Sequence, residues 1–421
     1  MRINTLFLLI LCLAFGKINY AQNNIEADIE KLEIFLSSVE NKYVDSVNTY
    51  SLIERAIKEM LKELDPHSVY LTAETYQSSS QTLNGKFKGI GIRYQIIDDT
   101  LTVLEVFEGS GAERAEIRLG DQIIAAGDDT LSGKRLTGDD ISDKLDNNAI
   151  TNEGITIWRN GGRERSLKYI SRSNITVSSV PAAFLIDENV GYLKLNKFTD
   201  NSASDVKMAL EKLNNNGLKK LILDLRGNTG GYLNRAVKIT DEFLEDRKLI
   251  LYTEGKSQPR RETFATSGGR FTNGDMVILL DENSASASEI LAGAIQDWDR
   301  GLIIGRRSFG KGLVQRPIEF KDGSAIRLTI SRYYTPTGRS IQQSYEFGYD
   351  AYKLSHQKRV ESGELISADS IFTPDSLVFY TPNNRTVYGG GGIFPDVFVP
   401  EDTSTFCSVI SLLRERGLIY G

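Results

Sequence analysis

From about Asn174 onward, apolar strand-like runs alternate with helical patterns, and no other feature of the sequence constrains the fold as much. The expected strands and helices, in chain order, are Val190–Leu195, helix Ser202–Asn214, Lys220–Leu225, helix Asn234–Phe243, Met276–Leu280, helix Ser286–Asp297 and Leu302–Ile304. Strands that alternate with helices are typical of an α/β core with a largely parallel sheet. A polar segment from about 346 to 385 interrupts this rhythm, and we interpret it as an insertion without an assigned role.

The N-terminus predicts export. Arg2 precedes an apolar run from Leu6 to Phe15, and the polar stretch after it ends at Ala21. This pattern is typical of a secretory signal peptide over residues 1–21, cleaved after Ala21, and it places the mature protein in the periplasm or cell envelope. A lipoprotein anchored at Cys12 is the alternative, although bulky Leu11 stands where a small residue is expected.

Composition excludes several classes of protein. The 421 residues are 40% hydrophobic and 25% charged, which fits a globular chain of two to three domains. A net charge of −6 provides no global positive field for binding nucleic acid. Two histidines and two cysteines are too few for an ordinary zinc site, so we expect no metal and no cofactor. Once the leader is removed, Cys407 is the lone cysteine, and we interpret it as a buried apolar residue.

Two modules precede the α/β part. Residues 22–84 show a helical pattern from Ile25 to Leu64, with Ser51-x-x-Glu54 resembling a capping box. So short a helical pair must pack on the main body or on a second copy, which leaves a homo-oligomer open. Residues 85–172 then carry short strands and one helical stretch, expected at Ile90–Arg93, Leu101–Val106, Gln122–Ala125, helix Asp139–Leu145 and Ile155–Arg159.

The loop Lys88-Gly89-Ile90-Gly91 leads into the first of these strands. Glycines allow backbone N–H groups to approach a carboxylate, and the edge of the strand can pair with an extended peptide. The loop therefore predicts a site for a protein C-terminus. The alternative is that these glycines serve tight turns alone.

The segment Asn283–Ile290 lies between an apolar strand and a helix and carries three serines. N–H groups at a helix start suit a serine nucleophile beside its own oxyanion donors. Alternatively, Ser286-x-x-Glu289 is simply a capping box. A base must come from elsewhere: His67 and His356 are distant in sequence, whereas Lys311 is flanked by glycines and apolar residues that disfavour its ammonium form. The common alternative for Lys311 is a surface lysine in a glycine turn.

Two other motifs share Lys311, and both fail at one place. Residues 305–311 match G-x-x-x-x-G-K of a phosphate-binding loop, but Gly312 replaces the hydroxyl residue that holds Mg²⁺. Ser308-x-x-Lys311 has the spacing of penicillin-binding enzymes, but no Lys-Thr-Gly follows it.

Three ordered motifs make the resemblance specific: Asp224–Gly231, Ser284–Ile290 and Ser308–Gln315. With Leu64–Ser68, Tyr334–Gln342 and Gly391–Asp396, they make the chain similar to the carboxyl-terminal processing peptidases, or tail-specific proteases. The module at 85–172 resembles a PDZ domain of the bacterial protease type. It departs from that pattern at Gly111, where proline is usual, and at Glu116, where glycine is usual.

This resemblance implies a crotonase-like (ClpP/crotonase-type) α/β protease core at 173–421, with an insertion at about 346–385, the PDZ domain and the N-terminal helical region. It implies that Ser286 is the nucleophile, that Lys311 is its base and that Gln315 orients the lysine. The oxyanion hole would combine the N–H of Ala287 with that of Gly230 or Gly231. An extended strand would separate the Cα atoms of residues 311 and 315 by about 13 Å, so contact between them requires a turn at Gly312 or a helical step.

The expected function is an exported serine endopeptidase that cleaves proteins near their C-terminal tails through an acyl-enzyme. Its partners would be unfolded or tail-exposed proteins, with an adaptor or activator left open. One alternative is a non-catalytic, PDZ-containing scaffold of the envelope. Another is a small-substrate hydrolase, for which a peptide-binding module would be needless.

Overall fold

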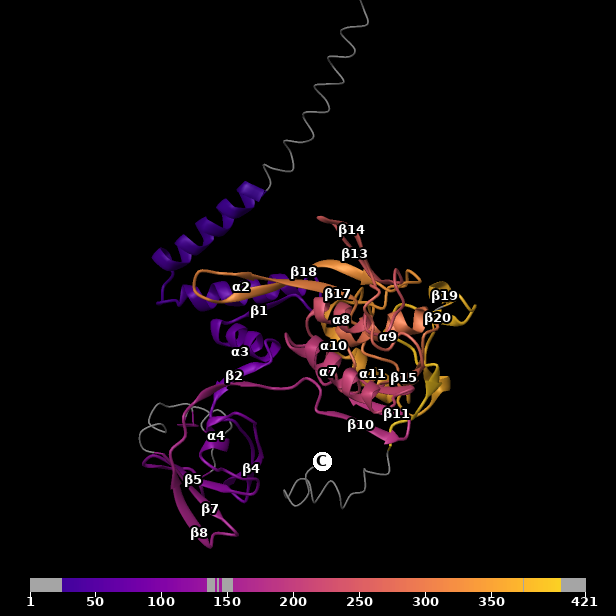
Figure 1. Ribbon diagram of the computed structural model, residues 1–421. Coiled ribbons are helices and arrows are strands. Elements are labelled where there is room, and N and C mark those ends of the chain that lie inside the picture. Colours follow the sequence, from indigo (N-terminus) through magenta and orange to yellow (C-terminus); the bar gives the residue numbers. More distant parts are fainter. Residues whose placement is uncertain (1–24, 135–140, 142–143, 146–153, 374, 403–421) are drawn as a thin grey trace, which may run out of the picture. The chain divides into compact units, whose positions relative to one another are not determined.

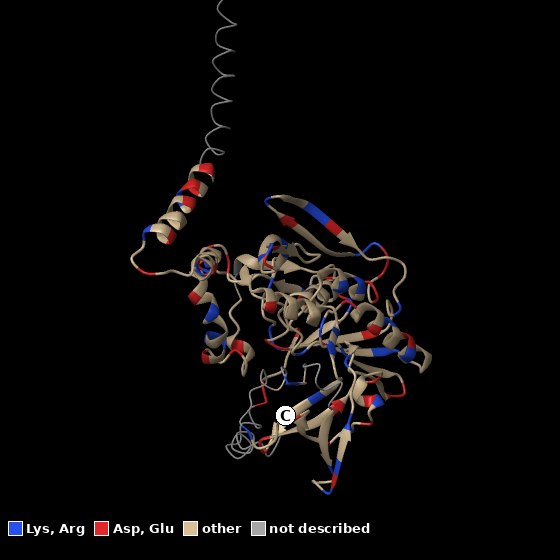
Figure 2. Cartoon of the chain, turned by 90° about the vertical axis from the view of Figure 1, so that its left-hand side faces the viewer, with Lys and Arg blue, Asp and Glu red and all other residues tan. Residues whose placement is uncertain are grey.

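The computed structural model describes residues 25–134, 141, 144–145, 154–373 and 375–402 (Figure 1). The expected signal peptide, Cys407 and most of the helix expected at Asp139–Leu145 lie outside these residues. The chain divides into two units, residues 1–70 and 71–421, which are described separately. Figure 2 shows basic and acidic residues interspersed along the ribbon rather than gathered by sign.

The described part of the first unit contains two helices. Residues 25–42 form one helix and α2 (Thr49–Lys62) a second. Asn48, rather than Ser51, caps α2, because its side chain accepts the N–H of Ser51 at 3.1 Å. None of the helices in the described ranges has both the length and the apolar run needed to span a bilayer.

The second unit contains the expected α/β core. Its six-stranded sheet has the order β10-β11-β12-β15-β16-β21, with β10 antiparallel to β11 and every other pair parallel. The strands are β10 (Ala182–Asp187), β11 (Val190–Lys194), β12 (Lys220–Asp224), β15 (Asp275–Leu280), β16 (Leu302–Gly305) and β21 (Val397–Phe398). The helices of this layer are α7 (Ser202–Asn215), α8 (Leu233–Thr240) and α9 (Ala287–Asp297).

Burial follows the expected pattern. Alternate residues of the central strands, such as Leu221 and Leu223, are almost fully buried and belong to one apolar cluster with residues of all three helices. Every residue of α9 is buried, which explains why its sequence is apolar on all sides and carries few charges. The predicted mixed α/β core with a largely parallel sheet is therefore confirmed, with element ends that differ from the prediction by at most three residues.

A β-rich segment with its own apolar cluster precedes this core in the sequence. Its sheet has the order β3-β4-β5-β7-β8, with β6 paired to β5, and β3 is an edge strand of that order. The elements are β3 (Ile92–Ile97), β4 (Thr100–Val106), α4 (Gly111–Arg114), β5 (Gln122–Ala126), β6 (Asp129–Thr130), β7 (Ile155–Arg159) and β8 (Glu164–Lys168). A separate pair, β2 (Lys86–Gly89) and β9 (Ser173–Thr176), joins the two ends of this segment.

The two departures from the PDZ pattern have local structural explanations. Glu116 has a φ of 57°, in the left-handed region that glycine adopts at little cost. Gly111 is the first residue of α4, a position that suits proline, but a Cβ there would lie 1.8 Å from the carbonyl oxygen of Ser171. This chain thus tolerates a strained residue at one position and leaves no room for a side chain at the other.

A second sheet joins β14 (Gln258–Phe264), β13 (Leu249–Gly255), β18 (Ala325–Tyr334) and β17 (Leu313–Glu319) in that order. The remaining elements are β1 (Val69–Leu71), α3 (Ala73–Leu83), α10 (Gly348–Lys353), α11 (Ser355–Glu361), η1 (Ala368–Ser370), η2 (Asp375–Leu377), β19 (Val378–Tyr380) and β20 (Thr386–Tyr388). The polar segment at 346–385 therefore contains short helices and part of a small hairpin.

Candidate active site

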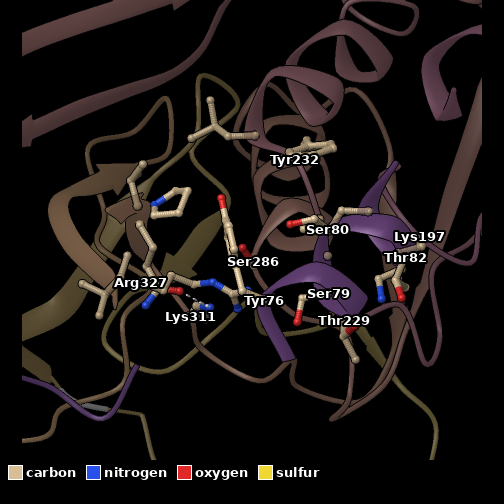
Figure 3. Close-up of a pocket in the computed structure, with 18 of the residues that line it drawn as sticks. Tyr76, Ser79, Ser80, Thr82, Lys197, Thr229, Tyr232, Ser286, Lys311 and Arg327 are labelled. Carbon is tan, nitrogen blue, oxygen red and sulfur yellow. Dashed lines mark hydrogen bonds between the residues drawn. The ribbon is translucent and has the colours of Figure 1, made fainter. Parts of the chain in front are cut away.

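A cavity of about 860 Å³ opens where α3, α9 and β17 meet (Figure 3). Tyr76 and Ser79 of α3 line one wall, and Lys311 and Gln315 line another. Ser286 faces the same cavity from the start of α9. The structure thus brings together the serine, the lysine and the glutamine singled out from the sequence.

The three serines of the motif have different environments. Ser284 and Ser288 are fully buried, and their hydroxyls donate to the carbonyl oxygens of Leu225 at 3.0 Å and Asn228 at 2.8 Å. Ser286 is partly exposed and lines the cavity. Two of the three hydroxyls are therefore committed to backbone structure, and Ser286 is the member of the run that a substrate in the cavity can reach.

Ser286 lies at a sharp turn between β15 and α9, with φ 55° and ψ −109°. This conformation costs energy for a residue with a side chain, and such strain persists only where the surroundings enforce it. The Glu289 carboxylate accepts the Ser286 N–H at 2.7 Å, while the Ser286 carbonyl accepts the N–H groups of Glu289 and Ile290. The capping-box interpretation and an accessible Ser286 are thus compatible.

Lys311 and Gln315 are in direct contact, because the Lys311 Nζ donates to Gln315 Oε1 at 2.9 Å. Lys311 and Gly312 precede β17, and the pairing of β17 with β18 shifts register between Val314 and Gln315. The segment is therefore not one regular extended strand, but its irregularity is this register shift rather than the expected turn at Gly312 or helical step. Gly312 donates its N–H to Gln342 Oε1 at 2.8 Å, so the Tyr334–Gln342 motif supports the segment of residues 308–312, the lysine segment.

Glu289 links the serine and lysine segments. It is fully buried, and its carboxylate accepts four donors: the N–H groups of Ser286, Gly310 and Lys311, at 2.7–2.9 Å, and the Ser308 hydroxyl at 2.5 Å. Burial raises the pKa of this carboxyl above its ordinary value, and the four donors oppose that rise. The sequence identified Glu289 only as a helix cap, since nothing local shows that residues 308–311 fold onto it.

Tyr333 makes a second link between the same two segments. Its hydroxyl lies 2.9 Å from the carbonyl oxygen of Lys311 and 3.1 Å from that of Ser286. Burial raises the pKa of Tyr333 well above 10, so the hydroxyl keeps its proton and remains a donor. No local pattern singles out Tyr333, and its position just before the Tyr334–Gln342 motif was the one available signal.

The glycine loop lies against the serine. A Cβ on Gly230 would be 2.9 Å from the Ser286 Cβ and 3.0 Å from the Ala287 nitrogen, so a side chain is excluded there. The Gly230 N–H donates to Asn228 Oδ1 at 2.9 Å. Within the described ranges, the N–H groups of Gly231 and Ala287 donate no hydrogen bond, so both are available to a bound group.

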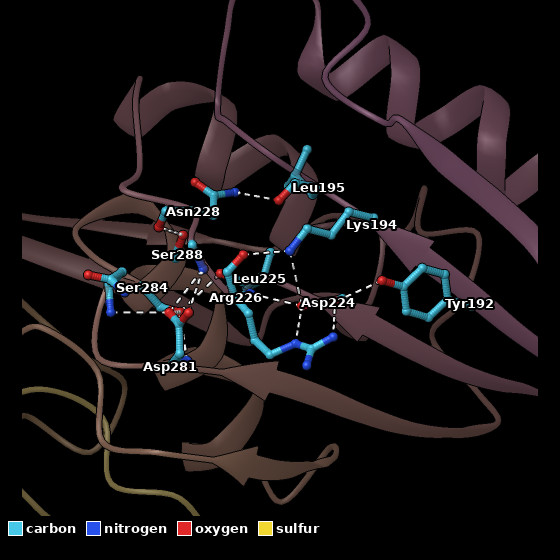
Figure 4. Close-up of polar contacts among 12 residues, drawn as sticks. Tyr192, Lys194, Leu195, Asp224, Leu225, Arg226, Asn228, Asp281, Ser284 and Ser288 are labelled. Carbon is cyan, nitrogen blue, oxygen red and sulfur yellow. Dashed lines mark hydrogen bonds and ion pairs between the residues drawn. The ribbon is translucent and has the colours of Figure 1, made fainter. Parts of the chain in front are cut away.

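Asp224 anchors the base of this loop (Figure 4). It is 1% exposed and accepts hydrogen bonds from Arg226, Tyr192 and Lys194 at 2.7–3.2 Å. Burial alone would raise its pKa, but the hydrogen bonds from Arg226 and Tyr192 prevail and hold the pKa at about 2. Asp224 and Arg226 therefore form an ion pair at the end of β12.

The other residues chosen from the sequence lie elsewhere. Lys88 and Gly89 belong to β2, Gly91 has a φ of 90°, and the carbonyl oxygens of Ile90 and Gly91 accept the N–H groups of Ala112 and Phe107. His356 lies in α11, and His67 in a turn that Asp65 closes by accepting the His67 N–H. No group of three or more His, Cys, Asp and Glu side chains suited to a metal ion occurs in the described part of the chain.

Comparisons with known proteins match two parts of the chain. Residues 189–350 match Peptidase family S41, and residues 15–75 match the N-terminal domain of the activating protease CtpB. A probable CtpA-like serine protease of Staphylococcus aureus (strain bovine RF122 / ET3-1) is 36% identical over 327 residues, which are 77% of this chain and 65% of the relative. The corresponding protein of Staphylococcus haemolyticus (strain JCSC1435) is 33% identical over the same shares. The chain thus spans 65% of the length of these curated relatives.

Solved structures of similar chains include the photosystem II D1 C-terminal processing protease. It is 25% identical, with 90% of each chain covered and a TM-score of 0.42. A putative S41 protease from Bacteroides fragilis NCTC 9343 is 16% identical, with 92% of this chain and 98% of the other covered and a TM-score of 0.47.

Proposed function

We propose a function from the premise that this chain belongs to peptidase family S41. The chain is an exported serine endopeptidase that cleaves protein substrates near their C-terminal tails. The observation that carries this proposal is the common cavity of Ser286 and Lys311, with the Lys311 Nζ held by Gln315 at 2.9 Å.

In the proposed reaction, the neutral amine of Lys311 takes the Ser286 hydroxyl proton as the Ser286 Oγ attacks a peptide carbonyl. The tetrahedral intermediate collapses, the C–N bond breaks, and the leaving amine takes that proton from Lys311. Water, activated by the same amine, then hydrolyses the ester and releases Ser286. Gln315 accepts one N–H of Lys311 and so fixes the direction of its lone pair.

Two N–H groups stabilise the oxyanion in this proposal. Ala287, directly after the nucleophile, supplies one, and Gly231 supplies the other, since the Gly230 N–H already donates to Asn228. The role of Gly230 is then steric, because its missing side chain leaves space beside Ser286. Donors of this kind are each worth about 10²–10³ in rate.

Residues 85–172 act as a PDZ domain and the α/β part as a crotonase-like protease core in this proposal. Free, apolar C-termini of unfolded or tail-exposed proteins would pair with the edge strand β3, next to the segment Lys88–Gly91. The protein substrate enters the cavity as an extended chain.

Proteolysis of a loosely folded substrate with an apolar C-terminal tail tests the proposal. The mature protein should cleave it, prefer it to the same substrate with a charged tail, and lose activity in Ser286→Ala and Lys311→Ala. Ser284→Ala and Ser288→Ala keep the nucleophile and should still be labelled by a fluorophosphonate. Cleavage that survives Ser286→Ala would contradict the assigned nucleophile, and a folded wild type that binds the tail without cleaving it would favour a scaffold.

A further inference from the structure

The polar segment at 346–385 buries two charged side chains, Arg359 of α11 and Glu364, which are 5% and 4% exposed. Arg359 Nε donates to Glu364 Oε1 at 2.9 Å. Burial lowers the pKa of Arg359, while the pKa of Glu364 is lowered by Arg307 and Arg359 against the effect of burial. Burying an ion pair costs desolvation free energy unless further hydrogen bonds satisfy both charged groups. The other contacts of Arg359 and Glu364 therefore show what this pair holds in place.

The remaining nitrogens of Arg359 bind the backbone that leads to the lysine. Nη1 donates to the carbonyl oxygen of Ser308 at 3.1 Å, and Nη2 to that of Arg307 at 2.6 Å. Glu364 accepts Arg307 Nε at 2.7 Å and Nη2 at 2.6 Å. The polar segment therefore fixes two consecutive carbonyl groups, four and three residues before Lys311.

From Ser308 the contacts continue to the site. The Ser308 hydroxyl donates to Glu289 at 2.5 Å, and it accepts the N–H of Ile393 at 2.7 Å. Glu289 in turn accepts the N–H groups of Ser286 and Lys311. One chain of hydrogen bonds thus joins Arg359 to both members of the proposed Ser–Lys pair.

We propose that Arg359 and Glu364 are positioning residues that hold the lysine segment, residues 308–312, in register with Ser286. This inference rests on the proposed function. The planar fork of a guanidinium fixes two carbonyl groups with a geometry that a lysine ammonium does not reproduce. When the Arg359 guanidinium is lost, the lysine segment is free to shift. A misplacement of about 1 Å in a reacting group costs on the order of 10² in rate.

Neither Arg359 nor Glu364 lines the cavity, so their loss should change turnover rather than substrate binding. A merely structural role would instead reduce stability without a specific effect on the chemical step. The separation of kcat from KM, together with the rate at which a small fluorophosphonate modifies Ser286, distinguishes these two cases.

Arg300 provides a matched control. It is partly buried, burial lowers its pKa, and its guanidinium donates to the carbonyl oxygens of Phe243, Gly274 and Phe271 at 2.8–2.9 Å. Arg300→Gln therefore removes a carbonyl-binding guanidinium of the same kind, but one that holds segments outside residues 307–311.

The experiment compares the full mature chain with Arg359→Gln, Arg359→Lys, Glu364→Gln and Arg300→Gln. Thermal unfolding gives the midpoint temperature of each variant. The kcat and KM on the tailed substrate and the rate of fluorophosphonate labelling are then measured at a temperature well below every midpoint. We expect Arg359→Gln to lower kcat and labelling by about tenfold or more with KM within about twofold, and Arg359→Lys to lie between it and the wild type. Glu364→Gln, the milder change, should show the same selective loss if Arg359→Gln does not fold.

Equal losses of kcat in the Arg359 and Arg300 variants at matched loss of stability would overturn the inference, as would a rise in KM at constant kcat. A wild type that cleaves and is labelled, with variants that keep its kcat, would overturn this inference alone. A folded wild type that neither cleaves nor is labelled would overturn the proposed function as well.

Discussion

The backbone N–H of Ser286 donates a 2.7 Å hydrogen bond to the carboxylate of Glu289, one turn further along α9. Ser286 has a positive φ, and this bond helps hold the residue in its strained conformation. The same carboxylate accepts the N–H of Lys311, so a single buried group sets the separation of the two segments that carry the proposed nucleophile and base.

Glu289→Gln should reduce activity strongly while keeping the size of the side chain. One acceptor oxygen becomes an NH₂ group that faces N–H donors, which leaves buried polar groups unsatisfied and should lower the free energy of unfolding by about 1–3 kcal/mol. We expect kcat to fall by about 10² or more. Substrate cleavage and urea unfolding measure these effects. The control is Glu242→Gln, which changes a carboxylate that is paired with Arg270. Full activity of Glu289→Gln would contradict the role of Glu289.

Tyr333→Phe removes the hydroxyl that lies between the carbonyl oxygens of Ser286 and Lys311. We expect a loss of about 1 kcal/mol in stability, the usual value of one hydrogen bond, and a kcat lower by about tenfold. Tyr334→Phe is the matched control, since the ring of Tyr334 stacks on Tyr252 at 4.7 Å between centroids. If both variants keep wild-type kcat, the Tyr333 hydroxyl does not position the pair.

The stability of the protein should depend on Asp224 in acid. Its pKa of about 2 lies below the ordinary 3.8, so the charged form stabilises the folded state above about pH 4, by about 2 kcal/mol. That contribution is lost as the pH falls from about 4 to about 2. Urea unfolding at pH 5 and pH 3 measures the free energy of unfolding of the wild type and of Asp224→Asn. The difference between the two proteins should be smaller at pH 3. A difference that does not change with pH would contradict this account, and Asp275→Asn, at an exposed ion pair with Lys220, should have little effect at either pH.

Glu116→Gly should stabilise the β-rich segment. Relief of the left-handed conformation should raise the free energy of unfolding by about 1–2 kcal/mol. The greater conformational freedom of glycine in the unfolded chain lowers it by about 0.5–1 kcal/mol, so the net gain in stability is small but positive. The lost contact between Glu116 and Lys168, at 3.5 Å and largely exposed, contributes little. Thermal unfolding should show a midpoint a few degrees higher, and a lower midpoint would contradict the strain argument. Glu164→Gly, in β8 and without a positive φ, should destabilise.

Much of the architecture could be predicted from the sequence. The period of apolar residues placed β12 and α7 to within one residue of their observed ends, because burial on one side of each element imposes that period. The strand expected at Ile90–Arg93 instead begins at Ile92, since Gly91 adopts a positive φ. The start of α2 was misjudged because Asn48 and Ser51 are both good helix caps, and local sequence does not choose between them.

The sequence by itself determined which chemistry is available: a serine run at a helix start, a lysine between glycines and a paired glycine, because reactivity depends first on residue type. Only the tertiary structure decided which serine reaches the cavity, and which glycine N–H already has an acceptor. It also decided that Glu289 and Arg359 both contact Ser308 of the lysine segment, although they lie 19 and 51 positions from it in the sequence. Such contacts form when distant segments pack together, and the periodicity of any single segment does not encode them.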